Sequence, residues 1–138
     1  MAMPKHETVA DHDAACSDVG RAALAQVRAV IDDLVPADLP REERMSYNLP
    51  TLFVGGKRVV HYAAWDAHLA LYPVPPPTSA DPTLVDDLAP FIKGKGTLHF
   101  PYAALSPPGA GPLSLISRVV AAHLARIGID VAPSEEPA

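Results

Sequence analysis

The sequence contains one cysteine among its 138 residues. A single thiol excludes an internal disulfide and is typical of a reducing compartment, so we predict a cytoplasmic protein. Long apolar runs are also missing, because none approaches the roughly 20 residues that a membrane-spanning helix needs. The first sixteen residues lack the apolar segment of a secretory signal. The sequence therefore predicts a soluble chain with no membrane partner.

Positive charge is scarce as well. The chain has 11 Lys and Arg against 16 Asp and Glu, a formal net charge of -5. A surface that binds nucleic acid needs a basic patch or stripe, whereas the basic residues here are scattered, so no nucleic-acid partner is predicted. Hydrophobic residues make up 49% of the chain, but much of this share is alanine, which predicts one modest core in a single domain.

Apolar residues at helical spacing predict three main helices and one short one. The predicted helices cover residues 17–35, 39–44, 81–88 and 112–127, the second being the short one. Ser17 or Asp18 is suited to cap the first helix. Asp81 is a good N-cap for the third, with Pro82 in its first turn, where a missing N–H costs nothing. Gly128 is typical of the residue that follows a helix.

Four β-rich runs predict an antiparallel sheet. They cover residues 51–54, 57–64, 68–72 and 97–100. Gly55 and Gly56 join the first two runs as a hairpin, because both positions of such a turn take positive φ. Helices set around one small antiparallel sheet give an α+β domain. We predict a flexible segment over residues 1–16, this domain over 17–128 and a flexible tail over 129–138.

Strand parity places several polar rings on one face of the predicted sheet. Alternate residues of a strand share a face, so His68 and Tyr72 lie together, and His99 joins them if its apolar neighbours face the helices. The core-facing set is then Leu69, Leu71, Leu98 and Phe100. Either His61 or Tyr62 adds to the face of His68, depending on a register that the sequence does not fix.

These residues predict a pocket for a small anionic ligand. The candidate ligand-binding residues are Tyr47, His68, Tyr72, Lys95, His61 and His99. Phenol, imidazole and ammonium groups can hydrogen-bond an anion, and imidazoles can also bind a metal. Lys95 stands between two glycines whose N–H groups could bind an anion, although a tight turn explains those glycines equally well. The alternative for the histidines is that they are ordinary polar residues on the wetter face of the sheet.

Several short blocks carry a resemblance to a known family. They are Glu43, Met45-Ser46-Tyr47-x-Leu49-Pro50, the VVHYAAW run, His68-x-x-Leu71-Tyr72-Pro73 and Lys93-x-Lys95-Gly96-Thr97-x-x-Phe100-Pro101. In these blocks, which reach from about the first long helix to the last, the chain resembles the YdhG-like family of small bacterial proteins. The resemblance implies an α+β fold. One branch of the family is described as a frataxin-like intracellular iron chaperone.

The resemblance also implies iron as a candidate ligand. Exposed carboxylates are hard oxygen ligands of the kind that exchangeable iron sites use. The candidate metal residues are Asp32, Asp33, Glu42 and Glu43. Solvation and helix capping are the alternative roles for these acidic residues.

The sequence carries no signature of a catalytic nucleophile. Ser46 has no GxSxG context, Cys16 has no accompanying motif, and His123 is expected to pack at the edge of the last helix's apolar stripe. We therefore predict a non-enzymatic protein that binds a small ligand or a metal, with iron delivery in the manner of frataxin as the function that the resemblance implies. The alternative is an interaction domain that forms a homodimer through the exposed face of the sheet.

Overall fold

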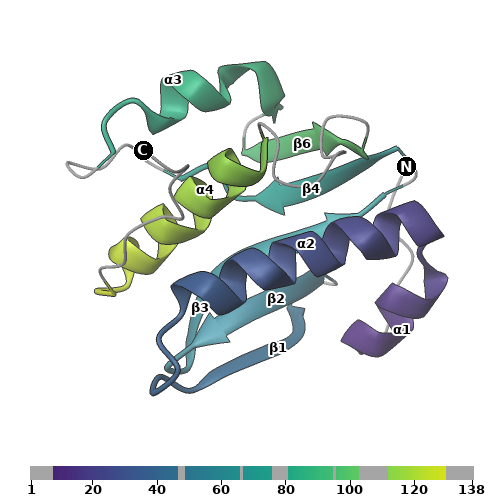
Figure 1. Cartoon of the computed structure of the whole chain (residues 1–138), viewed down its shortest axis with the longest axis horizontal. Coiled ribbons are helices and arrows are strands. Elements are labelled where there is room, and N and C mark those ends of the chain that lie inside the picture. Colours follow the sequence, from purple (N-terminus) through teal and green to yellow (C-terminus); the bar gives the residue numbers. More distant parts are fainter. Residues whose placement is uncertain are drawn as a thin grey trace.

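The long helices of the protein pack on one face of an antiparallel sheet. A computed structural model describes residues 8–46, 49–65, 67–75, 81–94, 96–102 and 112–129. Figure 1 shows α2 (Asp18–Leu34) and α4 (Pro112–Arg126) side by side across the sheet. This arrangement confirms the predicted α+β class. No helix within these ranges is long and apolar enough to cross a lipid bilayer.

The sheet has six strands in the described part of the chain, where the sequence predicts about four. In chain order they are β1 (Arg41–Ser46), β2 (Leu49–Val54), β3 (Lys57–Ala64), β4 (His68–Tyr72), β5 (Ile92–Lys93) and β6 (Thr97–Pro101). Their order across the sheet is β1-β2-β3-β4-β6-β5, and all neighbouring pairs are antiparallel. The four predicted strands correspond to β2, β3, β4 and β6, so the two missed strands are the edges.

β1 replaces the short helix predicted over residues 39–44, and that prediction was wrong. Arginine and glutamate are good helix formers, but helix propensity is a weak preference that tertiary contacts override. Here all six residues of the strand pair with β2, beginning with Arg41 opposite Val54. The carbonyl of Pro40 also accepts a hydrogen bond from the Gly55 amide at 2.7 Å. The strand conformation of residues 41–46 is therefore fixed by pairing with β2, which the local sequence of β1 does not reveal.

Both long helices begin and end as the sequence predicts. The Ser17 hydroxyl caps α2 by accepting a hydrogen bond from the Gly20 amide at 3.1 Å. Gly128 follows α4 with a φ of 91°. Its amide donates to the carbonyl of Ala125 at 3.0 Å, and the next amide donates to that of Leu124 at 2.9 Å. These two bonds form a Schellman motif, which satisfies carbonyls left open at a helix end.

The shorter helices differ from the prediction. They are α1 (Val9–Ala15), α3 (Leu84–Leu88) and the 3-10 turn η1 (Ala89–Phe91). α1 lies within the segment predicted to be flexible. α3 ends at Leu88 as predicted but begins at Leu84 rather than Pro82. The reason is that the Asp81 carboxylate, predicted to cap the helix, instead accepts two hydrogen bonds from Arg118 of α4, each 2.8 Å long.

The main core lies between the sheet and the long helices. Leu69, Leu71, Leu98 and Phe100 are fully buried there, which confirms the predicted core-facing set. The register between β2 and β3 places His61 opposite Thr51. Tyr62 is fully buried in the core cluster. The choice that the sequence left open is thereby settled: His61 belongs to the face away from the helices.

Replacing Gly56 by alanine is expected to lower the free energy of unfolding by about 1–2 kcal/mol. Gly56 has a φ of +80° and no neighbouring atom within 4 Å of a Cβ built on it. The cost would therefore come from the left-handed backbone conformation alone. Gly96 is a matched control, because its surroundings are equally open but its φ lies outside that region. Gly96→Ala should leave the free energy of unfolding unchanged or raise it slightly. If urea unfolding shows the same loss of stability in both variants, the left-handed backbone of Gly56 is not the cause.

Candidate functional site

A cavity of about 680 Å³ lies where β4 ends beside β3. The pairing of these strands covers His61 to Ala64 of β3, so the first residues of β3 run past the end of β4. The last turn of α4 reaches the same place. The cavity is lined by Lys57, Arg58, Val59, His61, Tyr72, Pro73, Val74, His123, Arg126 and Ile127.

The lining of this cavity is strongly basic. Lys57, Arg58 and Arg126 contribute three positive charges, and no residue of the described lining is acidic. Arg126 is held in place by β3, because its guanidinium donates to the carbonyl of Val59 at 3.2 Å and approaches that of Arg58 at 3.5 Å. The whole chain, in contrast, has a net charge of -5. Three of the 11 basic residues of the chain therefore line one cavity.

Tyr72 lines the cavity and carries a phenol hydroxyl. The indole Nε1 of Trp65 donates to the Tyr72 hydroxyl oxygen at 3.0 Å, so the hydroxyl's own proton is left for another acceptor. Burial raises the pKa of Tyr72, the bond from Trp65 only partly opposing this effect. The phenol therefore stays protonated at neutral pH and can donate to an anion.

His61 is bonded to a neighbouring side chain of β2. Its Nδ1 lies 2.6 Å from the hydroxyl oxygen of Thr51, and that hydroxyl donates to the carbonyl of Leu49 at 2.9 Å. The donor of the bond between Thr51 and His61 depends on the tautomer of the ring. Burial, and then the charge of Arg58, lower the pKa of His61. The ring is therefore neutral at neutral pH.

His123 of α4 is one of the residues that line the cavity. The sequence predicts packing for this residue, and its side chain is fully buried. Its Nε2 lies 2.8 Å from the carbonyl oxygen of Pro73, which can only accept, so Nε2 carries the proton. Nδ1 has no hydrogen-bond partner in the described structure. Burial lowers the pKa of His123 to about 4, the bond to Pro73 opposing and the charge of Arg126 reinforcing this shift.

The predicted ligand-binding residues divide into three sets. Tyr72 and His61 line the cavity. His68 and His99 lie on the same face of the sheet but form a separate pair, with ring centroids 3.9 Å apart. The common face of His68, Tyr72 and His99 is thereby confirmed, because the Trp65 ring stacks on His68 and hydrogen-bonds Tyr72. Tyr47 and Lys95, also predicted for the pocket, lie outside the described residues.

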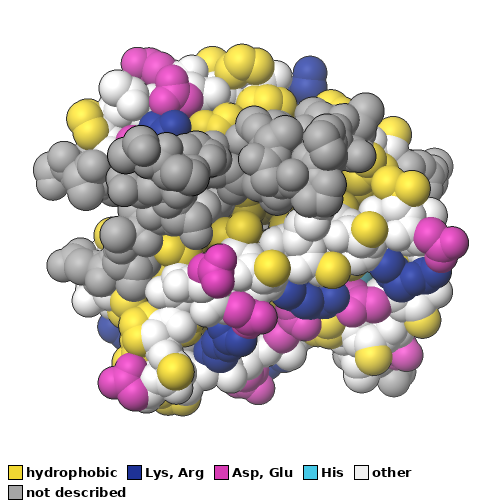
Figure 2. Space-filling model, in the orientation of Figure 1, with side chains coloured by type: hydrophobic (Ala, Val, Ile, Leu, Met, Phe, Trp, Pro, Cys, Tyr) yellow, Lys and Arg dark blue, Asp and Glu magenta, His cyan; other side chains and the backbone are white. Residues whose placement is uncertain are grey.

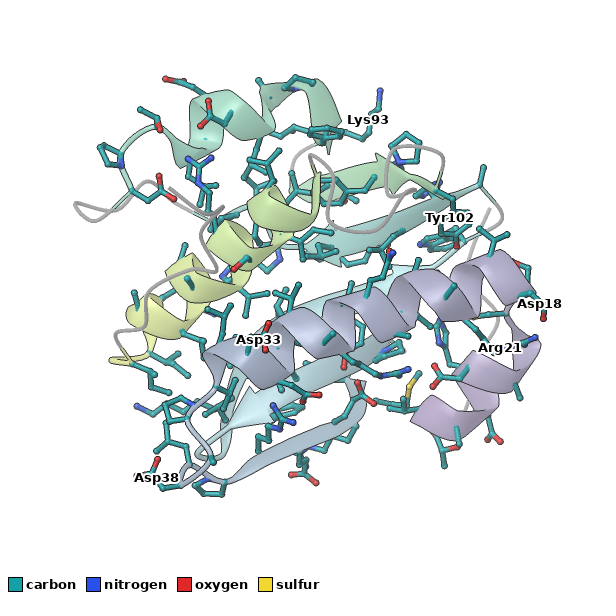
Figure 3. The ribbon with its side chains drawn as sticks, in the orientation of Figure 1. Asp18, Arg21, Asp33, Asp38, Lys93 and Tyr102 are labelled. Carbon is teal, nitrogen blue, oxygen red and sulfur yellow. The ribbon has the colours of Figure 1, made fainter. Side chains whose placement is uncertain are left out.

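Three of the four predicted iron ligands, Asp32, Glu42 and Glu43, line a cavity of about 260 Å³, but Arg28 and Arg41 line it as well. Asp32 pairs with Arg41, Glu42 lies 3.7 Å from Arg44, and Glu43 accepts bonds from Arg28 and Tyr62. Asp33 is exposed on α2, pointing away from the sheet in Figure 3. The strand conformation of β1 also sends Glu42 and Glu43 to opposite faces of the sheet. Among the described residues, no group of three or more His, Cys, Asp or Glu could hold a metal ion.

Charges on the helix-covered face are mixed. Figure 2 shows acidic and basic side chains interspersed along α2 and the strands beside it. Their ion pairs include Arg28 with Asp13 and Arg21 with Asp18. Such neutralised pairs attract a charged ligand weakly. This face therefore differs from the cavity, whose described lining carries charge of one sign.

Cys16 is not prepared for nucleophilic chemistry. Its sulfur lies 3.9 Å from Nδ1 of His12, but that nitrogen also lies 3.4 Å from the Asp13 carboxylate. Burial, and then the charge of Asp13, raise the pKa of the Cys16 thiol. A reactive cysteine needs a lowered pKa, because the thiolate is the nucleophile. The position of Cys16 therefore agrees with the absence of a cysteine-protease signature in the sequence.

The three cations of the cavity were missed at the sequence level. Lys57 and Arg58 follow the Gly-Gly turn, whereas Arg126 stands in the last turn of the last helix. A basic residue in the last turn of a helix is common, because it complements the helix dipole. The position of Arg126 in the sequence therefore did not indicate a binding site. Only the packing of α4 against β3 brings the three charges together.

The comparisons with known proteins identify no relative. No family model, curated protein or solved structure matches the chain. The resemblance to the YdhG-like family therefore stays a prediction. The geometry and charge of the cavity remain as the basis for a functional proposal.

Proposed function

We propose that this protein binds a small anion in the cavity between β3, the end of β4 and the C-terminal turn of α4. One observation carries the proposal: three cations and no described carboxylate line one cavity in a chain of net charge -5. Like charges repel one another, and a recess lined by one sign of charge concentrates its field. An anion would relieve this repulsion and be attracted by the field.

The donors of the cavity specify the kind of anion. Arginine side chains match carboxylate and phosphate groups through paired N–H bonds. Tyr72, which also lines the cavity, carries a neutral phenol. A volume of about 680 Å³ falls within the range of small-molecule sites. Val59, Val74 and Ile127 give the lining apolar surface as well, so a carboxylate or phosphate with an apolar part fits best.

The arrangement supports binding rather than catalysis. His123 lines the cavity with its Nε2 bonded to the carbonyl of Pro73, and its lowered pKa leaves the ring neutral at neutral pH. The raised pKa of Tyr72 makes it a donor rather than a base. Iron is left out of the proposal because three of the four predicted carboxylates are already paired with arginines.

Charge reversal at Arg126 tests the proposal. Isothermal titration at low ionic strength would measure the affinity for sulfate and for phenyl phosphate, which adds an apolar ring. Arg126→Glu should weaken both by about tenfold or more, because a lost charge-assisted bond is worth about 1.5–3 kcal/mol. Lys57→Glu is a second variant that leaves the bonds of Arg126 to β3 in place.

Arg21→Glu is the matched control for net charge. Arg21 lies beside Asp18 at the N-terminal end of α2, at the other end of the molecule from the last turn of α4 (Figures 1 and 3). Its reversal changes the total charge equally but should leave the anion affinity within about twofold, since exposed distant charges are screened by salt. If Arg126→Glu, Lys57→Glu and Arg21→Glu all lower the anion affinity equally, the effect is one of net charge and not of the cavity. If the unmodified protein shows no saturable anion binding, the proposed site is refuted.

A further inference from the structure

The anion cavity contains a titratable ring among its cations. His61 lines the cavity together with Lys57, Arg58 and Arg126. The side chain of His61 is half-buried, whereas that of His123, the other histidine of the described lining, is fully buried. Solvent protons therefore reach His61 more readily than His123.

The charged groups around His61 in the described structure are mainly cations. β2 places the uncharged Thr51 opposite His61, and β4 places Tyr72 opposite it on the other side. β1 lies one strand further and carries Glu42 and Arg44, which form an ion pair 3.7 Å long. The remaining titratable groups of the lining are Lys57 and Arg58 of β3 and His123 and Arg126 of α4. A positive charge on His61 would thus meet three cations and no carboxylate of the described lining.

The hydrogen bond of His61 is compatible with a charged ring. Its Nδ1 lies 2.6 Å from the Thr51 hydroxyl oxygen, and this hydroxyl donates to the carbonyl of Leu49 at 2.9 Å. An imidazolium carries a proton on both nitrogens, so Nδ1 can donate to Thr51 while Thr51 keeps its bond to Leu49. Nδ1 of His123, in contrast, has no hydrogen-bond partner in the described structure. A proton added there would be buried without an acceptor, which is costly.

We propose that anion binding in the cavity is coupled to the uptake of a proton by His61, so that the site binds its anion more tightly as the pH falls. This inference rests on the proposed anion function. Burial, and then the charge of Arg58, lower the pKa of His61 in the anion-free protein. A bound anion places an opposite charge beside the ring, and an opposite charge favours the charged form.

The coupling is reciprocal. If a bound anion raises the proton affinity of His61, a proton on His61 raises the anion affinity by the same factor. An opposite charge within about 4–6 Å moves a pKa by about 1–3 pH units, and each unit corresponds to a tenfold change in affinity. The ring is neutral at pH 7.5 with or without the anion, so the gain develops below neutral pH. We expect the affinity to rise about three- to tenfold between pH 7.5 and pH 5.5.

The experiment is isothermal titration of the full chain with sulfate between pH 7.5 and pH 5.5 at constant ionic strength. Sulfate keeps its charge throughout this range, so its own titration does not contribute. Titrations at pH 6 in two buffers of different ionisation enthalpy measure the protons taken up, and we expect net uptake by the unmodified protein. His61→Gln has no proton to gain and should lose this uptake and most of the pH dependence.

His99→Gln is the matched control. It removes a histidine of the same sheet face that does not line the cavity, so it changes the number of titrating imidazoles equally. Its sulfate affinity should rise with falling pH as in the unmodified protein. If His61→Gln and His99→Gln show the same pH dependence as the unmodified protein, the coupling to His61 is refuted.

A second measurement uses the unmodified protein and so does not depend on the folding of a variant. Histidine NMR signals followed against pH should show that sulfate raises the pKa of His61 and leaves those of His68 and His99 nearly unchanged. If proton uptake is lost in His123→Gln rather than in His61→Gln, the assignment to His61 is wrong. Saturable sulfate binding without proton uptake would refute the coupling and leave the anion site in place. If no saturable binding occurs at any pH, the anion site is refuted and the coupling with it.

Discussion

Replacing Phe100 by alanine should lower the free energy of unfolding by about 3–5 kcal/mol, the range for truncating a buried phenylalanine. Phe100 is fully buried in β6, and its ring contacts that of Phe91 with centroids 4.9 Å apart. The alanine leaves a cavity between the sheet and η1 that rigid secondary structure cannot close. A small domain has roughly 5–15 kcal/mol of stability in total, so the variant should unfold at much lower urea concentration.

The neighbouring residue provides the control. His99→Ala removes a side chain of similar position in the strand but on the uncovered face, where truncation should cost less than about 1 kcal/mol. The comparison tests strand parity, because the two residues are adjacent ring-bearing side chains that occupy opposite faces of the sheet. Similar losses in the two variants would mean that both faces of β6 are packed alike, contrary to the structure.

Lowering the pH from 7.5 to 5 should reduce the free energy of unfolding by about 2 kcal/mol through His123 alone. The pKa of His123 is about 4 in the folded protein, against an ordinary value of 6.5. The unfolded chain therefore takes up a proton first, and protonation favours unfolding between these two values. This contribution to stability is complete above pH 6.5 and is lost as the pH falls towards 4.

A His123→Gln variant isolates this effect. The glutamine amide can still donate to the Pro73 carbonyl but has no proton to gain in this range. Urea unfolding of both proteins across the pH range should show a smaller slope for the variant. The pKa values of His61, His68 and His99 are also lowered, so the difference between the two slopes is the quantity to compare. Parallel slopes would contradict a buried neutral His123.

Local sequence patterns were sufficient for the elements whose signals lie within a few residues. The Gly55–Gly56 turn, the Ser17 cap of α2 and the bounds of β4 all match the structure. β1 was predicted as a helix because its residues favour one locally, while the strand that fixes its conformation is a separate element. Register is a property of two strands, and it cannot be read from either one alone.

Only part of the candidate site could be predicted from the sequence. The alternation of side chains along each strand correctly predicted that His68, Tyr72 and His99 share one face of the sheet. This alternation can be read from each strand by itself. The cavity itself depends on Arg126 meeting Lys57 and Arg58 across nearly half of the chain. No periodicity links such distant positions, and the charges therefore seemed scattered. The anionic ligand was predicted from Tyr72 and the histidines, whereas most of the charge that would hold it comes from elsewhere.

The edge strand β1 also limits how two copies of this protein could associate. Arg41, Glu42, Glu43 and Arg44 read the same in both directions. A second molecule added to this edge in a symmetric antiparallel register would therefore place glutamate against glutamate and arginine against arginine. Like charges directly opposite each other destabilise strand pairing, and charged edges are a known protection against sheet-to-sheet aggregation. In this register the charges of β1 therefore disfavour pairing between two copies at this edge.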